Sequence, residues 1–591
     1  MIRYQQIGAP LDHAHAKLRT EQLRKWLRQN GYQGLLISHD DAFLGEYIQK
    51  CDERLCWATG FSGSAGLAFI SPEGGSLVTD GRYLLQAKQE VSPSGLDVVP
   101  LEDRAMVLEE LTRDAVIVAW PDQFDHDSWV FWGEHIDRAG GQLLALNEHP
   151  VDLLWEDRPL RKRSQPTAHP IAYAGFEAAE KLTSIRAMMD EKNLAALFVG
   201  DCCAVAWLCN IRGRDIPHTP IIQASMLIMQ DMVCIQMEGA ERIGALQALL
   251  GDGFKVGDDS VDHQLLTMHA GTIGFDPRHT NARMAQKFSC FEKQEPMPCP
   301  LNRMKMIKND AEIMGMREAH LRDGVAMVKF LAGLEQDPAQ DELSLVAKLE
   351  TARDLDDDLF DISFDTICGI DAHGAIIHYR VSEASNIPLC SEGSLVLIDS
   401  GGQYSFGTTD ITRCLWIGPH EPSQAIIDDH TLVLKAHIAL GQAKFPAGTN
   451  GIQLDAITRA PLWLEGRDFA HGTGHGVGAA LSVHEGPCGI HKRAQQPLQE
   501  GMVLSNEPGL YVENSHGIRI ENLVLVAKDE QGLCFETLTL CPIDLRLIDP
   551  KKLTSQEVGW LNAYHQLVFD RLAPHLNTHE QAWLKQACRA V

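Results

Sequence analysis

Five residues that could bind metal ions each follow or interrupt a strand-like apolar run. They are Asp399, Asp410, His475, Glu507 and Glu521. An apolar strand that carries an ionised carboxylate toward a buried site incurs a large desolvation cost, unless a cation or a hydrogen-bond network compensates it. Several such segments converging on one point therefore predict a metal site.

Two local patterns indicate how these side chains are brought together. Asp399 and Asp410 are separated by a glycine-rich stretch, which predicts two strands with a hairpin-like connection and both carboxylates side by side. Two carboxylates so close together repel each other unless cations bind between them. In residues 517–525 the side-chain period of a strand puts Arg519 and Glu521 on one face, so Arg519 is expected to orient a ligand carboxylate.

His475 lies in the segment HGTGHGVG, whose glycines allow close approach of the backbone and unusual dihedral angles. His471 and His475 have the i, i+4 spacing of a helical zinc motif. The glutamate of H-E-x-x-H is absent, however, and the glycines argue against a helix, so we reject that interpretation. A phosphate-binding loop is also disfavoured, because no Lys-Ser/Thr pair follows.

The donor set favours two metal ions. Four carboxylates carry four negative charges, which two divalent ions would balance. Oxygen-rich ligation with one imidazole and no thiolate favours manganese, with cobalt, iron and zinc as alternatives. Such a pair activates water and polarises a carbonyl, which is hydrolase chemistry. Any one of these acids alone would more often be a turn former or a helix cap, and His378 and His484 alone would more often be core or rim residues.

The elements expected to position the site come after two similar segments. Residues 17–30 have helical periodicity and are followed by a strand-like run at 34–38, and residues 176–193 and 194–199 repeat this order. The repetition predicts two related α/β domains, joined by a polar, proline-bearing linker around residues 157–166.

A third domain is expected to be α+β. Asn309 and Glu312 form a capping box before a long helical run, and short strand-like runs fill residues 360–527. Thr554 and Glu557 form another capping box before an apolar helical face in the tail. The predicted domains are residues 1–157, 158–300, 301–528 and 529–591.

Composition excludes several classes of function. A chain of 591 residues is expected to form two to four domains. Its 52 Lys and Arg against 80 Asp and Glu give a net charge of −28, which argues against nucleic acid and anionic membranes as partners. No signal peptide and no long apolar run is evident. The fifteen cysteines form no C-x-x-C pair, so we expect a soluble, unexported chain with reduced cysteines, mostly in the core.

Taken together, the phrases LVLIDSGG, GTTDITR, HGTGHGVG, SNEPGLY and GIRIENLVLV resemble the metal-dependent peptidases with the pita-bread fold. Upstream, FDTICG and GAIIHYR resemble the substrate-side strand of that family. Further phrases resemble the long, three-domain Xaa-Pro aminopeptidases of the cytosolic type: GFSGSAG at 60–66, WEDRP at 155–159, WLCNIRG at 207–213 and WLNAYH at 560–565. The implied fold is two related α/β N-terminal domains, a pita-bread (creatinase/aminopeptidase-like) catalytic domain and a C-terminal helical extension.

The resemblance also implies roles. Asp399 would bind one metal, His475 and Glu507 the other, and Asp410 and Glu521 would bridge the pair. Glu507 would also be the general base for the water that attacks the scissile carbonyl. The substrate side would be lined by His378, His471 and His484, where an imidazole can steady a developing oxyanion. The implied cofactors are two divalent ions, with Mn²⁺ favoured and Zn²⁺ or Co²⁺ as alternatives.

The implied activity is hydrolysis of the first peptide bond of peptides with proline at position 2, by a cytoplasmic homodimer. That bond joins a tertiary amide without an N–H, so general peptidases that recognise this N–H lose a contact. Prolidase uses the same five ligands, but prolidase-like chains usually lack the second α/β domain and the tail. Methionine aminopeptidase needs only the catalytic domain. A non-catalytic pita-bread binding module is the third alternative, and the retention of all five ligands argues against it.

Overall fold

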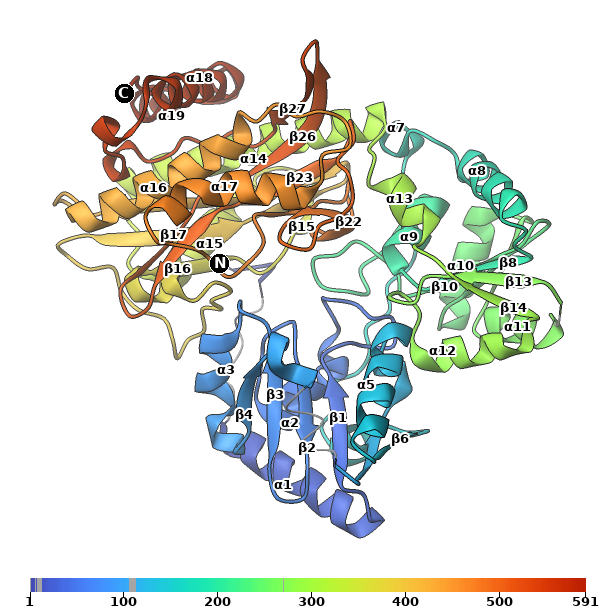
Figure 1. Cartoon of the computed structure of the whole chain (residues 1–591). Coiled ribbons are helices and arrows are strands. Elements are labelled where there is room, and N and C mark those ends of the chain that lie inside the picture. Colours follow the sequence, from blue (N-terminus) through green and yellow to red (C-terminus); the bar gives the residue numbers. More distant parts are fainter. Residues whose placement is uncertain (1, 6, 8–12, 106–112, 269) are drawn as a thin grey trace. The chain divides into compact units, whose positions relative to one another are not determined.

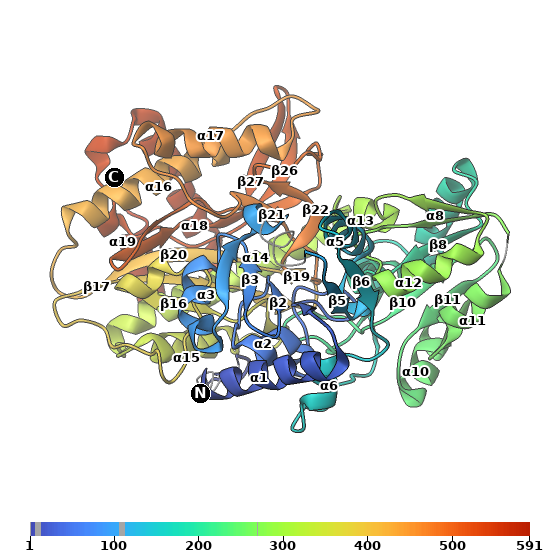
Figure 2. The same cartoon turned by 60° about the horizontal axis from the view of Figure 1, so that its bottom comes forward.

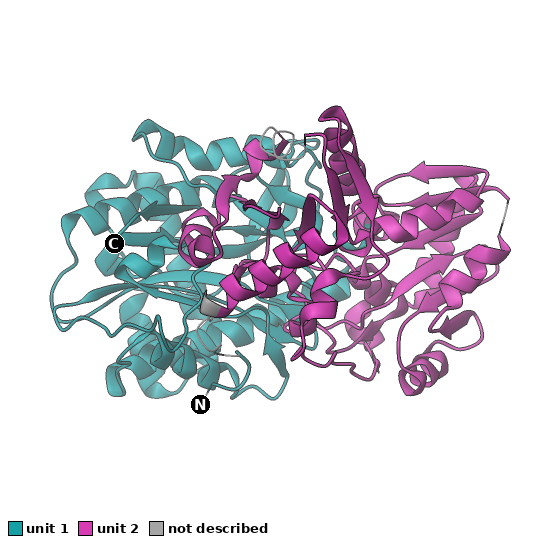
Figure 3. Cartoon of the chain, turned by 90° about the horizontal axis from the view of Figure 1, so that it is seen from below, with its two compact units in different colours: residues 1–10, 304–591 teal, residues 11–303 magenta. Residues whose placement is uncertain are grey.

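The computed structural model describes residues 2–5, 7, 13–105, 113–268 and 270–591 (Figure 1). The chain divides into two compact units, coloured separately in Figure 3. The N-terminal unit comprises Leu11–Arg303. The C-terminal unit comprises Met1–Pro10 and Met304–Val591. The division after Arg303 lies close to the predicted boundary at residue 300, and the bounds of the four predicted domains stay predictions.

The first half of the N-terminal unit is a six-stranded mixed sheet in the order β4-β3-β2-β1-β5-β6. The strands are β1 (Gly34–Ser38), β2 (Leu67–Ile70), β3 (Gly75–Thr79), β4 (Asp97–Pro100), β5 (Val116–Ala119) and β6 (Gln142–Ala145). The helices are α1 (His13–Asn30), α2 (Arg54–Thr59), α3 (Leu84–Val91), α5 (His126–Arg138) and α6 (Pro150–Leu154). The predicted helix and strand at 17–30 and 34–38 are therefore confirmed. Figure 2 shows α1 beside this sheet.

The second half repeats this sheet in the order β12-β11-β10-β8-β13-β14. Its strands are β8 (Ala196–Val199), β10 (Ser225–Ile228), β11 (Val233–Gln236), β12 (Phe254–Gly257), β13 (Thr272–Phe275) and β14 (Lys293–Pro296). Its helices are α8 (Ala178–Glu191), α9 (Cys202–Cys209), α10 (Ala240–Leu250), α11 (Ser260–Thr267) and α12 (Ala282–Lys287). In both sheets the third and fourth strands of the order pair antiparallel, and the fourth and fifth pair parallel. The two α/β halves share one topology, as the repeated pattern predicted.

The C-terminal unit is a mixed α+β structure. Its two main sheets are β16 (Ile367–Ile370), β17 (Ser394–Ser400) and β20 (Ile411–Ile417), and β22 (Glu485–Ile490), β21 (Gly474–Gly476), β23 (Val503–Asn506), β26 (Asn522–Asp529) and β27 (Gly532–Thr537). Smaller sheets pair β24 (Gly509–Val512) with β25 (His516–Arg519), and β15 (Leu359–Ile362) with β18 (Gly402–Tyr404) and β19 (Gly407–Thr408). The main helices are α14 (Asp310–Gln336), α15 (Glu342–Arg353), α16 (Gln424–Gly441) and α17 (Gly451–Leu464).

Helices cover both faces of the five-stranded sheet. Alternate residues of β23 and β26 point to opposite sides, where one set packs with Met316 of α14 and the other with Leu440 of α16 and Leu454 of α17. Because both faces are covered, residues 523–526 of β26 form an unbroken apolar run. The predicted capping box of Asn309 and Glu312 is present at the start of α14.

The tail forms α18 (Ser555–Leu572) and α19 (Thr578–Ala587), with the predicted capping box of Thr554 and Glu557 at the start of α18. The apolar face of α18 is buried in the same core cluster as the residues of β17 and α16. The chain itself therefore covers this face.

The predicted strand over residues 517–525 is wrong in one respect. The chain leaves its pairing with β24 after Arg519 and begins its pairing with β23 at Asn522, so Ile520 and Glu521 lie between two strands. All fifteen cysteines are free, and most are buried. Among the described helices, none combines the length and the apolarity needed to cross a membrane.

Candidate metal centre

The first pair of acids is set by the antiparallel strands β17 and β20. Asp399 lies opposite Thr412, and Asp410 is the residue immediately before β20. Both acids are buried. Burial, followed by the charges of Asp399 and Glu507, raises the pKa of Asp410 well above its ordinary value. The side-by-side placement expected from the glycine-rich connection is thus what the fold produces.

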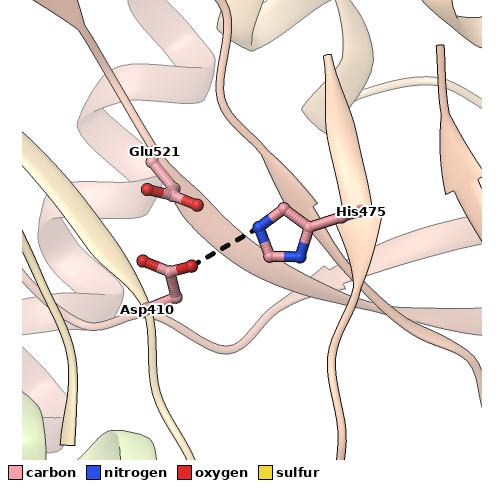
Figure 4. Close-up of side chains that lie close together, drawn as sticks. All are labelled: Asp410, His475 and Glu521. Carbon is pink, nitrogen blue, oxygen red and sulfur yellow. Dashed lines mark ion pairs between the residues drawn. The ribbon is translucent and has the colours of Figure 1, made fainter. Parts of the chain in front are cut away.

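His475, on the short strand β21, faces these acids. One ligand atom each from Asp410, His475 and Glu521 lies within 4.8 Å of the others (Figure 4). His475 Nε2 is 3.5 Å from Asp410 Oδ2 and 3.5 Å from Glu507 Oε1. Its Nδ1 lies 3.0 Å from the carbonyl oxygen of Gly476, which assigns the proton to Nδ1. Nε2 is therefore the ring nitrogen that faces the acidic cluster.

Glu507 and Glu521 are each held by one hydroxyl group. Ser505 Oγ donates to Glu507 Oε1 at 3.0 Å, and Thr412 Oγ1 donates to Glu521 Oε2 at 2.8 Å. Burial raises the pKa of Glu507. Burial, with the charges of Asp410 and Glu507, raises that of Glu521. These acids form a cluster that disfavours its own full ionisation.

The oxygens that the protein leaves unpaired indicate what the cluster could hold. Among the described residues, Asp399 Oδ1, Asp410 Oδ1 and Glu521 Oε1 are buried and have no hydrogen-bond partner. Three orphan carboxylate oxygens in one cluster are costly unless a cation binds them. Four carboxylates and one imidazole fit a pair of divalent cations that prefer oxygen ligands.

Arg519 contacts the cluster from the end of β25. Its Nη2 donates to Asp399 Oδ2 at 2.6 Å, its Nη1 to Tyr511 Oη at 2.7 Å, and its Nε to Thr412 Oγ1 at 3.1 Å. The sequence predicted the orienting contact of Arg519, but it missed Tyr511 and Thr412. Thr412 lies two residues after Asp410 in the sequence, and Tyr511 lies four residues after Glu507. This closeness in sequence to predicted ligands is the signal that could have identified them.

Two of the three predicted histidines lie beside the cluster. His471 Nδ1 donates to the carbonyl oxygen of Gly472 at 2.7 Å and lies 3.9 Å from Glu507 Oε2, and its Nε2 lies 2.8 Å from Tyr511 Oη. The ring of His484 stands at 78° to that of His475, with 4.3 Å between the centroids. Both imidazoles are therefore near the predicted ligands.

His378 is half-buried in the turn after the short helix η6 (Asp371–Ala375). This helix packs tightly on β25: a Cβ atom at Gly517 would lie 1.7 Å from the carbonyl oxygen of Gly374. Only a glycine at 517 allows this approach. The turn is thus brought against the strand that ends at Arg519, and the position of His378 relative to the acids stays a prediction.

Four family models match consecutive parts of the chain. Residues 314–528 match metallopeptidase family M24, residues 19–120 and 157–312 match creatinase/prolidase N-terminal domains, and residues 531–591 match the C-terminal region of peptidase M24.

Relatives with similar sequences extend over almost the whole chain. A probable Xaa-Pro aminopeptidase P from Paracoccidioides brasiliensis is 34% identical and covers 97% of this chain and 99% of its own. Aminopeptidase P2 of Arabidopsis thaliana is 35% identical over 94% of this chain and 85% of its own. The crystal structure of an X-prolyl aminopeptidase from Caenorhabditis elegans, described as a cytosolic enzyme with a di-nuclear active site, superposes with a TM-score of 0.90 at 30% identity, covering 98% of this chain and 100% of that one.

Proposed function

This chain belongs to the Xaa-Pro aminopeptidase group of metallopeptidase family M24 and is a metal-dependent peptidase, and we propose that it releases the first residue from peptides whose second residue is proline. The observation that carries the proposal is the set of three orphan carboxylate oxygens beside His475 in one buried cluster. The relatives named for the same activity support it.

We assign the ligands as the family pattern implies. Asp399 would hold one ion, His475 and Glu507 would hold the other, and Asp410 and Glu521 would hold both. The oxygen-rich donor set favours Mn²⁺, with Zn²⁺ and Co²⁺ as alternatives. A bound pair of divalent ions supplies a more acidic water and a polarised carbonyl.

The chain's own groups then serve the reaction. Glu507 is the general base, since burial raises its pKa toward the range in which a carboxylate accepts a proton efficiently. Arg519 orients Asp399 through their 2.6 Å contact. His378, His471 and His484 line the substrate side, and the hydrogen bond with Tyr511 Oη fixes the orientation of the His471 ring.

The proposed assembly is a cytoplasmic homodimer. An exposed apolar face of α17 supports it: the exposed fractions are 46% for Ile457, 48% for Trp463 and 86% for Leu464. A helix face of this kind is usually covered by a partner. A second copy of the chain fits, because the net charge of −28 disfavours nucleic acid and anionic membranes.

Metal analysis combined with a substrate panel tests the proposal. The panel contains Xaa-Pro-Xaa peptides, matched Xaa-Ala peptides and Xaa-Pro dipeptides. We expect about two equivalents of divalent metal and turnover of the longer proline peptides only. Preference for the dipeptides would indicate a prolidase, and no turnover with any peptide would indicate a binding module.

Asp410→Ala provides the residue-level test. We expect loss of hydrolysis while the chain stays folded. The control is Asp529→Ala, because Asp529 is an exposed acid of the same unit that pairs with Lys444. Normal turnover by Asp410→Ala at saturating Mn²⁺ would remove the proposal.

A further inference from the structure

Arg413, on β20, is a buried guanidinium that joins the two segments supplying the proposed bridging acids. Its Nη1 donates to the carbonyl oxygens of Thr412 at 2.9 Å and Glu521 at 2.7 Å. Its Nη2 donates to Asn522 Oδ1 at 2.8 Å. Among the described residues it forms no salt bridge, so neutral oxygens compensate the cost of burying its charge.

These contacts fix Glu521 on both sides. The N–H of Glu521 donates to the carbonyl oxygen of Thr412 at 3.1 Å, and Thr412 Oγ1 donates to Glu521 Oε2 at 2.8 Å. With the bond from Arg413, the main chain and the side chain of Glu521 are both tied to residues 412–413. Asp410 lies two residues earlier, so one short segment sets the spacing between the two proposed bridging acids.

The remaining acceptors of Arg413 come from the C-terminal region. Its Nε donates to the carbonyl oxygen of Pro542 at 3.2 Å, and its Nη2 to that of Cys541 at 2.8 Å. The same Nη2 donates to Tyr564 Oη on α18, also at 2.8 Å. The extension beyond β27 thus supplies three of the six oxygens around this guanidinium.

Packing and hydrogen bonds hold the side chain of Tyr564 beside Arg413. It is buried, and its ring stacks on Trp560 with 5.4 Å between the centroids. Its hydroxyl accepts from the N–H of Cys541 at 3.3 Å and donates to the carbonyl oxygen of Cys541 at 2.8 Å. Burial raises the pKa of Tyr564 to about 12, so it stays a neutral phenol. Packing of the apolar face of α18 alone would not require this hydroxyl.

We propose that the C-terminal region is a positioning element of the metal centre, in which Tyr564 holds Arg413 and Arg413 holds Glu521 in register with Asp410. The inference rests on the proposed ligand roles of Asp410 and Glu521. Tyr564 is a positioning residue, and its hydroxyl contacts neither substrate nor metal. Mutation of residues that support metal ligands typically lowers metal affinity by about 10- to 100-fold.

The test is Tyr564→Phe in the full chain, which removes one hydroxyl and keeps the ring. Val568→Ala is the matched control, because Val568 lies one turn further along α18 and is buried in the same cluster. Mn²⁺ content is measured after equilibration with a graded series of chelator concentrations, and the absorption spectrum is recorded after Co²⁺ substitution. We expect Tyr564→Phe to weaken Mn²⁺ binding by about 10-fold or more and to change the spectrum. Val568→Ala should lower thermal stability without either effect.

Two results would overturn the inference: wild-type Mn²⁺ affinity in Tyr564→Phe, or an equal loss of affinity in Val568→Ala. Arg413→Lys is a second variant, which keeps the charge but reaches fewer oxygens, and should weaken binding at least as much. The proposed function fails separately, if the unaltered chain binds no divalent metal ion and cleaves no proline peptide. A wild-type chain that binds metal and cleaves proline peptides, with Tyr564→Phe unchanged, would refute only the role of the C-terminal region.

Discussion

Arg519→Lys tests how the acids of the metal centre are held. Arg519 donates three hydrogen bonds in fixed directions, to Asp399, Tyr511 and Thr412. A lysine keeps the charge beside Asp399, but its single nitrogen cannot reach all three acceptors with the geometry of a guanidinium. The substitution therefore removes orientation and leaves the net charge unchanged.

The magnitude follows from the contacts that are lost. Lysine retains the bond to Asp399 and loses those to Tyr511 and Thr412, each contributing about 0.5–1.5 kcal/mol. A total of about 1–3 kcal/mol corresponds to roughly 5- to 150-fold. That range includes the 10- to 100-fold loss in metal affinity typical of residues that support ligands. We expect this loss in Mn²⁺ affinity and in kcat/KM.

The assay is chelator competition for Mn²⁺ together with kcat/KM for a proline peptide. Arg242→Lys is the control, since Arg242 forms a similarly buried pair with Asp215, at 2.5 Å, in the N-terminal unit. Both variants should be less stable, but only Arg519→Lys should bind Mn²⁺ more weakly. Wild-type affinity and kcat/KM in Arg519→Lys would refute the reasoning, and so would an equal loss in Arg242→Lys.

Four further outcomes are expected. Gly517→Ala would put a methyl group 1.7 Å from a carbonyl oxygen of η6, so it should lower the free energy of unfolding by at least about 1–3 kcal/mol and displace the turn that carries His378. The control is Gly559→Ala in α18, which has open space around it and should be neutral or stabilising by up to about 1 kcal/mol. Chemical denaturation measures both variants. The raised pKa values of the buried carboxyls mean that the metal-free chain holds protons there, so calorimetry in buffers of different ionisation enthalpy should show proton release on Mn²⁺ binding. A carboxyl whose pKa is raised in the folded state stabilises the fold fully below its unfolded pKa, and this stability is lost as the pH rises through the folded pKa. Mn²⁺ should therefore raise the unfolding midpoint more at pH 8 than at pH 5. The opposite order would contradict the argument that burial raises these pKa values. Leu464→Glu should convert a homodimer to monomers in light scattering, and an unchanged mass would exclude this face of α17 as the interface.

The sequence predicted those parts of the structure that depend on neighbouring residues. The capping boxes before α14 and α18 are local hydrogen-bond patterns, and both are present. The repeated helix-strand order could also be detected, because each half of the N-terminal unit carries it within a short stretch. The apolar phrases identified the acids, since the desolvation cost of a buried carboxylate is visible from its immediate neighbours.

Contacts between distant residues could not be predicted in this way. Arg413 and Tyr564 are separated by 151 positions, and the local sequence around either residue does not indicate that it contacts the other. The break at Ile520 also depends on distant partners. β24 pairs with residues up to Arg519, and β23 pairs from Asn522 onward, so the exchange of partner strands sets the break. A periodicity argument within one segment cannot detect such an exchange.

In two of the buried acids, one carboxylate oxygen is hydrogen-bonded and the other is not. Asp399 uses Oδ2 to bind Arg519 and leaves Oδ1 unpaired, and Glu521 uses Oε2 to bind Thr412 and leaves Oε1 unpaired. In each case one oxygen fixes the side chain to the protein and the other is buried without a partner. Random burial of acids would not produce this division, because a buried oxygen without a partner is destabilising. A site in which one oxygen of each carboxylate is hydrogen-bonded and the other is unpaired has the geometry expected for binding cations. Each of these hydrogen bonds can therefore be removed separately, and its effect on metal affinity can be measured.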